Sequence, residues 1–245
     1  MCEHAVNAAN RTFSKAHIEY ATNLLVHLMM RVEHRYIKEG LYTPKGATAL
    51  LIGTFPSVLI REKFGRLRLT DTNFFYGSID NNFWPDLGAI YNRTFLFDQS
   101  QTAIQQRAQL LDDLGLALSD AIYACETLGS AMDTALEHIE LNETLIETLD
   151  NTPTITTLFF TSSSGKVNAE SLTLRLLKGK SRSSNMKITQ AKGPRMRSFL
   201  YTDNLGRQRL LKTITLYSPS PLAEQWGGLT KEKRRQQYAT YLPRL

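Results

Sequence analysis

The chain has 245 residues, of which 42% are hydrophobic, and a net charge of +6. A chain of this length can bury a substantial core, so one globular domain is expected in preference to two small ones. Its two cysteines, Cys2 and Cys125, are too few for a disulfide framework or a four-cysteine metal cluster, and they fit a reducing cytoplasm. The N-terminus lacks a signal-peptide pattern and no run of about 18 apolar residues offers a membrane span, so we expect a soluble cytoplasmic protein.

Apolar side chains recur at helical spacing over residues 12–39, which predicts an N-terminal helix within an extension covering residues 1–46. The run ATALLIG, residues 47–53, has no alternation and predicts a strand buried on both faces of a parallel sheet. The stretch LGLALSDAIYA, residues 114–124, predicts a second strand that runs into a helix.

The second half of the chain continues this alternation. Residues 140–151, ELNETLIETLDN, predict a helix that ends before Pro153, and the β-branched run at 154–162 predicts a third strand. Residues 197–218 predict a basic hairpin that turns near Asp203 to Gly206 and continues into a fourth strand. A final helix is expected over residues 230–242.

The positive charge is concentrated in the last third of the chain. Residues 1–164 carry 12 Lys and Arg against 19 Asp and Glu, net −7, whereas residues 165–245 carry 17 against 4, net +13. A strong positive field on part of a domain attracts polyanions, of which nucleic acid is the commonest. The charge therefore indicates a nucleic-acid partner, with a solvated surface that binds nothing as the alternative.

Strands that alternate with helices predict an α/β layered fold with a mainly parallel four-stranded sheet, which binds ligands at the carboxyl ends of its strands. Three loops should share this edge: GTFPSV at residues 53–58, TSSSG at 161–165 and YSPSP at 217–221. The aromatic stretch FFYGSIDNNFWPDL, residues 74–87, follows the first loop. Its rings beside short amides and carboxylates fit either a core that meets a turn or a pocket that stacks a flat ring.

Four blocks of the sequence, in this order, resemble the uracil-DNA glycosylase superfamily, and most closely its hypoxanthine-DNA glycosylase branch. The blocks are GTFPSV at 53–58, FFYGSIDNNFW at 74–84, GLALSDAIYACETLGSAMD at 115–133 and LYSPSP at 216–221. The resemblance implies a three-layer αβα domain over residues 47–245. The chain departs from the family by basic insertions at about 59–73 and 175–212.

This resemblance implies a monofunctional DNA glycosylase, a hydrolase that flips a damaged or modified base out of DNA and cleaves its N-glycosidic bond, leaving an abasic site for DNA repair. By the match to the family, Asn81 is the main catalytic candidate, and its amide would position the attacking water. Asp80 and Asp120 are the nearest carboxylate helpers, although a turn former and a cap are their structural alternatives.

The resemblance also suggests which residues meet the base and the DNA. The expected base pocket contains Thr54, Phe55, Phe75, Tyr76 and Ser78, whereas Phe83 and Trp84 are expected in the core. The loop with Ser162, Ser163 and Lys166 suits phosphate binding at a helix start. Further expected DNA contacts are Ser218, Ser220, Arg195, Arg197 and Leu222, with Leu222 or Trp226 as a wedge that fills the gap in the helix.

The expected partner is double-stranded DNA with a flipped base, or single-stranded DNA, bound by a monomer without cofactor or metal. Ser78-Ile79 replaces the family's His-Pro, so the accepted base can differ, for example a sugar-decorated cytosine of phage DNA removed as antiviral defence. A catalytically silent DNA-binding protein is the alternative from another class, because the first loop lacks an acid and the last loop lacks a histidine. A nucleotide hydrolase is disfavoured because the sequence has no phosphate-binding loop motif.

Overall fold

The computed structural model describes residues 29–38, 42–57, 67–130 and 132–245, without the side chains of residues 226 and 227. The chain divides into two compact units, Met1–Met30 and Arg31–Leu245, a division that falls earlier than the predicted boundary at residue 46. No helix within the described ranges is long and apolar enough to cross a membrane.

The helix predicted over residues 12–39 lies mostly outside the described residues, and the prediction is wrong at residues 30–33. Met30–Glu33 forms strand β1, and the short helix α2 covers Arg35–Lys38. Strand pairing overrides the helical spacing here, because β1 joins a three-stranded sheet in the order β1-β4-β5.

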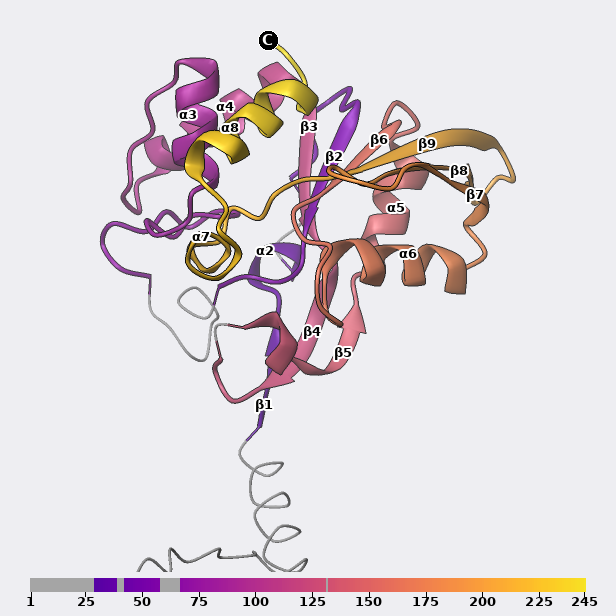
Figure 1. The fold of residues 1–245 in the computed structure, drawn as a ribbon, viewed down its shortest axis with the longest axis horizontal. Helices are drawn as coiled ribbons and strands as arrows, with labels where there is room; N and C mark the ends of the chain where they lie inside the picture. Colours follow the sequence, from indigo (N-terminus) through magenta and orange to yellow (C-terminus); the bar gives the residue numbers. More distant parts are fainter. Residues whose placement is uncertain (1–28, 39–41, 58–66, 131) are drawn as a thin grey trace, which may run out of the picture. The chain divides into compact units, whose positions relative to one another are not determined.

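The main sheet has six strands in the order β3-β2-β6-β9-β8-β7, where four were predicted. Four neighbouring strands are parallel, namely β3 (Leu116–Asp120), β2 (Ala49–Gly53), β6 (Thr157–Phe160) and β9 (Gln208–Thr215). The other two, β8 (Met196–Thr202) and β7 (Ser183–Gln190), are antiparallel and extend the sheet on one side (Figure 1). The prediction of an α/β fold with a mainly parallel sheet and a basic hairpin is confirmed.

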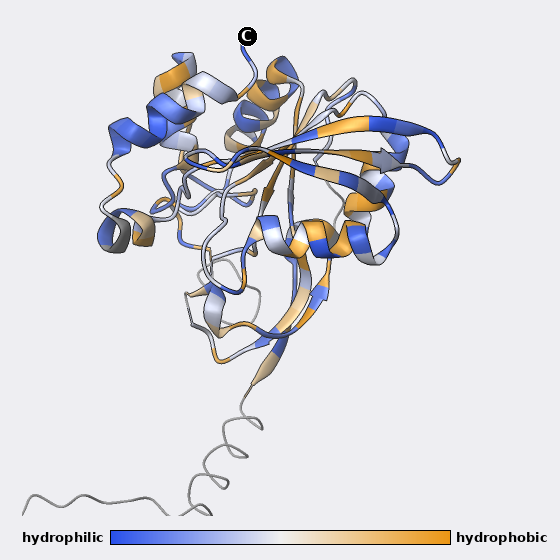
Figure 2. Cartoon of the chain, turned by 45° about the vertical axis from the view of Figure 1, so that its right-hand side comes forward, coloured by the Kyte–Doolittle hydropathy of each residue, from blue (hydrophilic) through white to orange (hydrophobic). Residues whose placement is uncertain are grey.

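Helices cover both faces of the parallel strands. Helices α5 (Thr144–Asn151) and α6 (Ala169–Gly179) pack on one face, and α3 (Phe83–Tyr91), α4 (Gln101–Leu114) and α8 (Lys231–Tyr241) pack on the other (Figure 1). Strand β2 is buried throughout, with Leu50 and Ile52 in the first core and Leu51 in the second. Figure 2 shows hydrophobic stretches along the strands and a largely hydrophilic α8. This double burial explains why β2 reads as a continuous apolar run.

The stretch after β3 is a strand and not the predicted helix. Strand β4 (Ile122–Thr127) pairs with β5 (Glu137–Leu141) in antiparallel fashion, and the 3-10 turn η2 (Asp133–Ala135) lies between them. The backbone of His34, just after β1, donates to the carbonyl of Tyr123 at 2.7 Å. The small sheet β1-β4-β5 therefore brings the β1–α2 junction close to the end of β3.

Candidate active site at the carboxyl edge of the sheet

The candidate site lies where the order of the parallel strands reverses. From β2 the chain continues to β3 on one side and later to β6 on the other, so β2 and β6 form a topological switch point. Open α/β sheets bind ligands beyond the carboxyl ends of the strands at such a point. Thr54 after β2 and Ser162 after β6 meet here, with their hydroxyl oxygens 2.7 Å apart. The two predicted loops therefore share one edge.

Asp120, the last residue of β3, is paired with a histidine that the sequence analysis missed. Its Oδ2 lies 2.7 Å from Nε2 of His34, and both side chains are buried. The two residues are 86 positions apart, and His34 lies in a segment whose spacing predicts a helix. No local sequence pattern therefore indicates that they pair. Asp120 is therefore not a helix cap, its structural alternative. It ends a strand and pairs with a buried histidine.

Hydrogen bonding fixes the tautomer of His34. The backbone N–H of Ile37 donates to Nδ1 at 3.2 Å, which requires a lone pair on that nitrogen. The proton of the neutral imidazole is therefore on Nε2, and Nε2 donates to the Asp120 carboxylate. A second proton on this ring would break the bond from Ile37.

Gly53 leaves room for two polar groups beside this pair. A methyl group built on Gly53 would lie 2.1 Å from Oδ1 of Asp120 and 2.5 Å from the hydroxyl of Tyr76, so both oxygens flank the same point. The hydroxyl of Tyr76 is also 3.3 Å from Oγ1 of Thr161. Burial, together with the negative charge of Asp120, raises the pKa of Tyr76 well above its usual value. The phenol therefore stays protonated and can donate a hydrogen bond.

The backbone places Tyr76 in an unusual conformation. Its φ is +55°, a region that aromatic residues rarely adopt. The following Gly77 has no space for a side chain, because a methyl group there would lie 1.9 Å from the carbonyl oxygen of Thr72. Such strain is concentrated at functional sites in many proteins, and here it presents the Tyr76 ring at the carboxyl edge.

Aromatic rings surround His34. Phe55 lies edge-on with its ring centroid 5.5 Å from that of His34, and the Phe75 centroid is 5.7 Å away. Both phenylalanines are buried, at 9% and 3% exposure, so neither presents the open stacking face that was predicted for the base pocket. Tyr76 is partly exposed and packs on Phe83 with 4.5 Å between centroids. Phe83 and Trp84 are fully buried, which confirms their prediction as core residues.

Two other predicted residues, Ser78 and Asp80, belong to a cluster around Arg68. The Arg68 guanidinium donates to Asp71 at 3.0 Å and to the hydroxyl of Ser78 at 3.1 Å, and it pairs with Asp80 at 2.9 Å. The Asp71 carboxylate also accepts the backbone N–H of Ile79 at 2.9 Å. Hydrogen bonds from Arg68 and from the backbone lower the pKa of Asp71 despite its burial. Asp80 is exposed, so the cluster fixes the loop before α3 and leaves Asp80 at the surface.

Asn81 has a structural bond of its own. Its side-chain oxygen accepts the backbone N–H of Phe83 at 2.9 Å, a turn that starts α3. The next residue, Asn82, donates its backbone N–H to the carbonyl of Pro219 at 3.0 Å, which joins the aromatic stretch to the last loop. No hydrogen bond joins the carboxamide nitrogen of Asn81 to another residue that the structure describes.

The last loop is organised by its serines. Ser218 accepts the backbone N–H of Ser220 at 3.2 Å, and Ser220 caps the short helix α7 (Pro221–Gly227) by accepting from Leu222 at 3.3 Å. Leu222 is partly exposed, and the side chain of Trp226 lies outside the described residues. Both serine oxygens therefore already act as acceptors within the loop.

The first N–H groups of α6 donate hydrogen bonds to residues of the loop that follows β6. Ser162 Oγ accepts the N–H of Ala169 at 2.8 Å, the Ser162 carbonyl accepts that of Glu170 at 3.2 Å, and Asn168 accepts that of Ser171 at 2.8 Å. The N–H groups in the first turn of α6 therefore already have partners within the protein. Lys166 in the same loop is exposed.

Arg195 and Arg197 share one buried carboxylate. Both donate to Glu170, at 3.1 Å and 2.9 Å from their Nε atoms, and Glu170 is 2% exposed. Arg195 also donates to the carbonyl of Ser163 at 3.4 Å. These contacts tie β8 to the start of α6 and leave the trio with one net positive charge.

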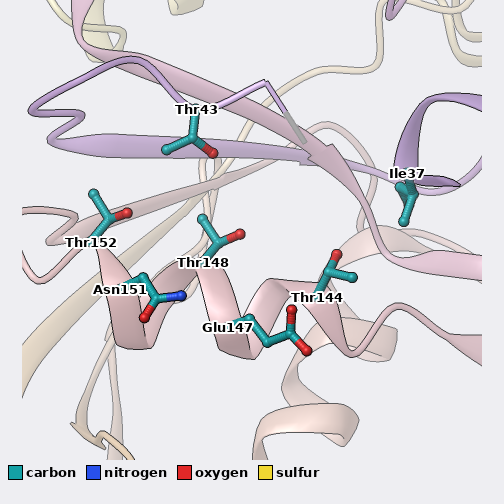
Figure 3. Close-up of a pocket in the computed structure, with 7 residues that line it drawn as sticks. All are labelled: Ile37, Thr43, Thr144, Glu147, Thr148, Asn151 and Thr152. Atoms are coloured by element: carbon teal, nitrogen blue, oxygen red, sulfur yellow. The ribbon is translucent and has the colours of Figure 1, made fainter. Parts of the chain in front are cut away.

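Two cavities lie away from this edge. One, of about 340 Å³, lies between α5 and the residues Ile37 and Thr43, and four of its seven lining residues are threonines (Figure 3). The other, of about 550 Å³, lies beside α4. Neither is lined by a residue of the predicted site. Among the described side chains, no three His, Cys, Asp or Glu gather as a metal site would require.

No protein-family model, curated protein or solved structure matches this chain significantly. The candidate site therefore depends on its own geometry: the hydroxyls of Thr54, Ser162 and Tyr76, and the Asp120 carboxylate held by His34.

Proposed function

We propose that the chain is a monofunctional DNA glycosylase that hydrolyses the N-glycosidic bond of a flipped base. The observation that carries this proposal is the placement of the Asp120 carboxylate beside the Tyr76 hydroxyl above Gly53, at the switch point of the sheet. In one reaction, a carboxylate can stabilise a developing positive charge, and a protonated phenol beside it can stabilise a developing negative charge.

The two groups match the demands of base release. Breaking the bond puts positive charge on the sugar and negative charge on the departing base, so a useful site offers a carboxylate for water and the sugar, and donors for the base. Asp120 supplies the carboxylate, and the raised pKa of Tyr76 keeps its hydroxyl a donor. Asn81, through its free amide nitrogen, holds the water or the substrate in line.

The cationic residues at the same edge provide phosphate contacts. Gln190 at the end of β7 pairs with Met196 at the start of β8, and Met196 pairs with Ile214 near the end of β9. The loop between β7 and β8, with Lys192, therefore lies at the carboxyl edge together with Lys166 after β6. Both lysines are exposed, and phosphate contacts from such residues position a protein on DNA without reading sequence.

A base-release assay on duplexes that contain uracil, hypoxanthine or glucosylated hydroxymethylcytosine tests the proposal. We expect the chain to convert at least one duplex to an abasic product. Binding of these duplexes without release from any of them would instead support the catalytically silent DNA-binding protein.

Two variants of Asn81 separate its structural and chemical roles. Asn81→Asp keeps an oxygen acceptor for the Phe83 N–H and removes the amide donor, whereas Asn81→Ala removes both. We expect both variants to bind DNA with nearly normal affinity and to release base about 100-fold more slowly. If Asn81→Asp retains full activity, the amide nitrogen has no part in the reaction.

A further inference from the structure

His34 forms a polar contact with Asp120 inside an otherwise aromatic environment. Its ring is fully buried, with Phe55, Phe75 and Tyr36 as ring neighbours at centroid distances of 5.5 to 6.0 Å. An apolar side chain would fill such a space without the cost of burying an imidazole. Packing alone therefore does not explain a histidine at this position. Its hydrogen bond to Asp120 offsets the free-energy cost of burying the imidazole.

The hydrogen bonds give the two oxygens of Asp120 different tasks. Oδ2 is committed to Nε2 of His34 at 2.7 Å, while Oδ1 faces the point above Gly53 that the Tyr76 hydroxyl also flanks. The Ile37 N–H donates to Nδ1 and so holds the ring in the orientation that directs Nε2 at Asp120. His34 is thus a fixed donor that orients the Asp120 carboxylate and leaves its Oδ1 on the side of the Tyr76 hydroxyl.

We infer that His34 is the positioning residue of the proposed hydrolysis, acting through Asp120. This inference rests on the proposed glycosylase function and adds a residue from outside the six-stranded sheet to its machinery. His34 does not contact the substrate, and because its tautomer is fixed it does not relay a proton.

The step that Asp120 would carry out is balanced as follows. The bond between C1′ of the sugar and the base nitrogen breaks, and both bonding electrons leave with the base. The oxygen of a water molecule bonds to C1′ and gives its proton to Oδ1 of Asp120. That proton then passes through solvent to the departing base, so that the products are the neutral base and an abasic sugar, and Asp120 returns to its charged form.

Variants of His34 test the inference on the duplex that the wild-type chain cleaves. His34→Leu removes the donor, and His34→Gln restores an N–H near the position of Nε2. His138→Gln is the matched control, because His138 is an exposed histidine on β5. We expect His34→Leu to lower kcat about 100-fold with KM nearly unchanged, and His34→Gln to recover much of the loss.

A double variant distinguishes positioning from general stability. If His34 acts through Asp120, then adding His34→Leu to Asp120→Asn lowers kcat little further, because effects of residues that act as one unit are not additive. A loss that is just as large in the Asp120→Asn background overturns the inference, as does a His34→Leu variant as active as His138→Gln.

Nitrogen-15 NMR of the wild-type full chain measures which ring nitrogen of His34 carries the proton. This test does not depend on whether a variant folds. The inference requires that His34 carry its proton on Nε2, and a proton on Nδ1 overturns it whatever the activity. If the wild-type chain releases no base from any duplex, the proposed function fails and this inference fails with it. If it releases base and His34→Leu is unaffected, this inference alone is wrong.

Discussion

The carboxylate of Asp120 occupies the space in which a side chain on Gly53 would lie. A methyl group at Gly53 would be 2.1 Å from Oδ1, closer than any real contact between such atoms. The absent side chain at the end of β2 is therefore what allows a polar group from the neighbouring strand β3 to reach the carboxyl edge.

Gly53→Ala should accordingly displace Asp120 and Tyr76 and so affect both stability and the proposed activity. We expect the free energy of unfolding to fall by about 1–3 kcal/mol, as for other overpacked sites, and base release to be lost. The matched control is Gly179→Ala at the end of α6, where nothing lies within 4 Å of the added methyl group. Urea unfolding that gives equal stability for the two variants would contradict the close approach.

Charge reversal at Lys166 and Lys192 should weaken DNA binding. Each lysine that contacts a phosphate contributes about 0.9 to the slope of log K against log salt concentration, so Lys166→Glu with Lys192→Glu should lower both affinity and slope. Lys212→Glu is the control, because Lys212 is exposed and pairs with Thr157 at the start of β6, at the opposite end of the sheet. Equal losses from both changes would show that the carboxyl edge is not the binding side.

A buried ion pair joins α3 to α8. Arg234 and Asp86 are both fully buried, and their Nε and Oδ2 atoms are 2.5 Å apart. Asp86→Ala leaves a buried guanidinium without this partner and should cost about 3–5 kcal/mol of unfolding free energy. Asp113→Ala, which breaks the more exposed pair with Arg93 at 3.3 Å, should cost less than about 1 kcal/mol. Thermal or urea unfolding of the two variants measures the difference.

Alkaline pH should destabilise the fold through its buried tyrosines. Burial raises the pKa of Tyr91 to about 12, and its hydroxyl donates to the Pro243 carbonyl at 2.7 Å. The unfolded chain loses this proton near pH 10, so the stabilisation is complete below about pH 10 and is lost as the pH rises towards about 12. Tyr91→Phe should show a shallower decline of unfolding free energy over this range. An unchanged slope would mean that Tyr91 titrates normally.

Much of the fold could be predicted because its signals are local. The continuous apolar run of β2, the alternation of the β8–β9 hairpin around Gly206 and the helix that ends before Pro153 each follow from neighbouring residues. The mainly parallel sheet follows from their order, and so does the meeting of the loops after β2 and β6 at one edge.

The parts that were missed depend on distant pairing. Strand β1 shows helical spacing, and β5 is mostly exposed and charged, so neither has a strand pattern of its own. His34 becomes notable only when Asp120 is placed beside it. Phe75 likewise cannot be assigned to a pocket or to the core from the sequence, because phenylalanine is common in both.

The outer edge of β7 has a consequence for behaviour at high concentration. Among the described strands β7 is the last of the sheet, so the backbone groups on its outer side offer a template on which another copy of the chain could add a strand. Irregular pairing with β8 between Ser184 and Lys187 and again between Ile188 and Gln190 distorts that template, and the exposed Lys187 places charge on it. These features should hinder the growth of fibres along this edge, even though Ile188 is 58% exposed there.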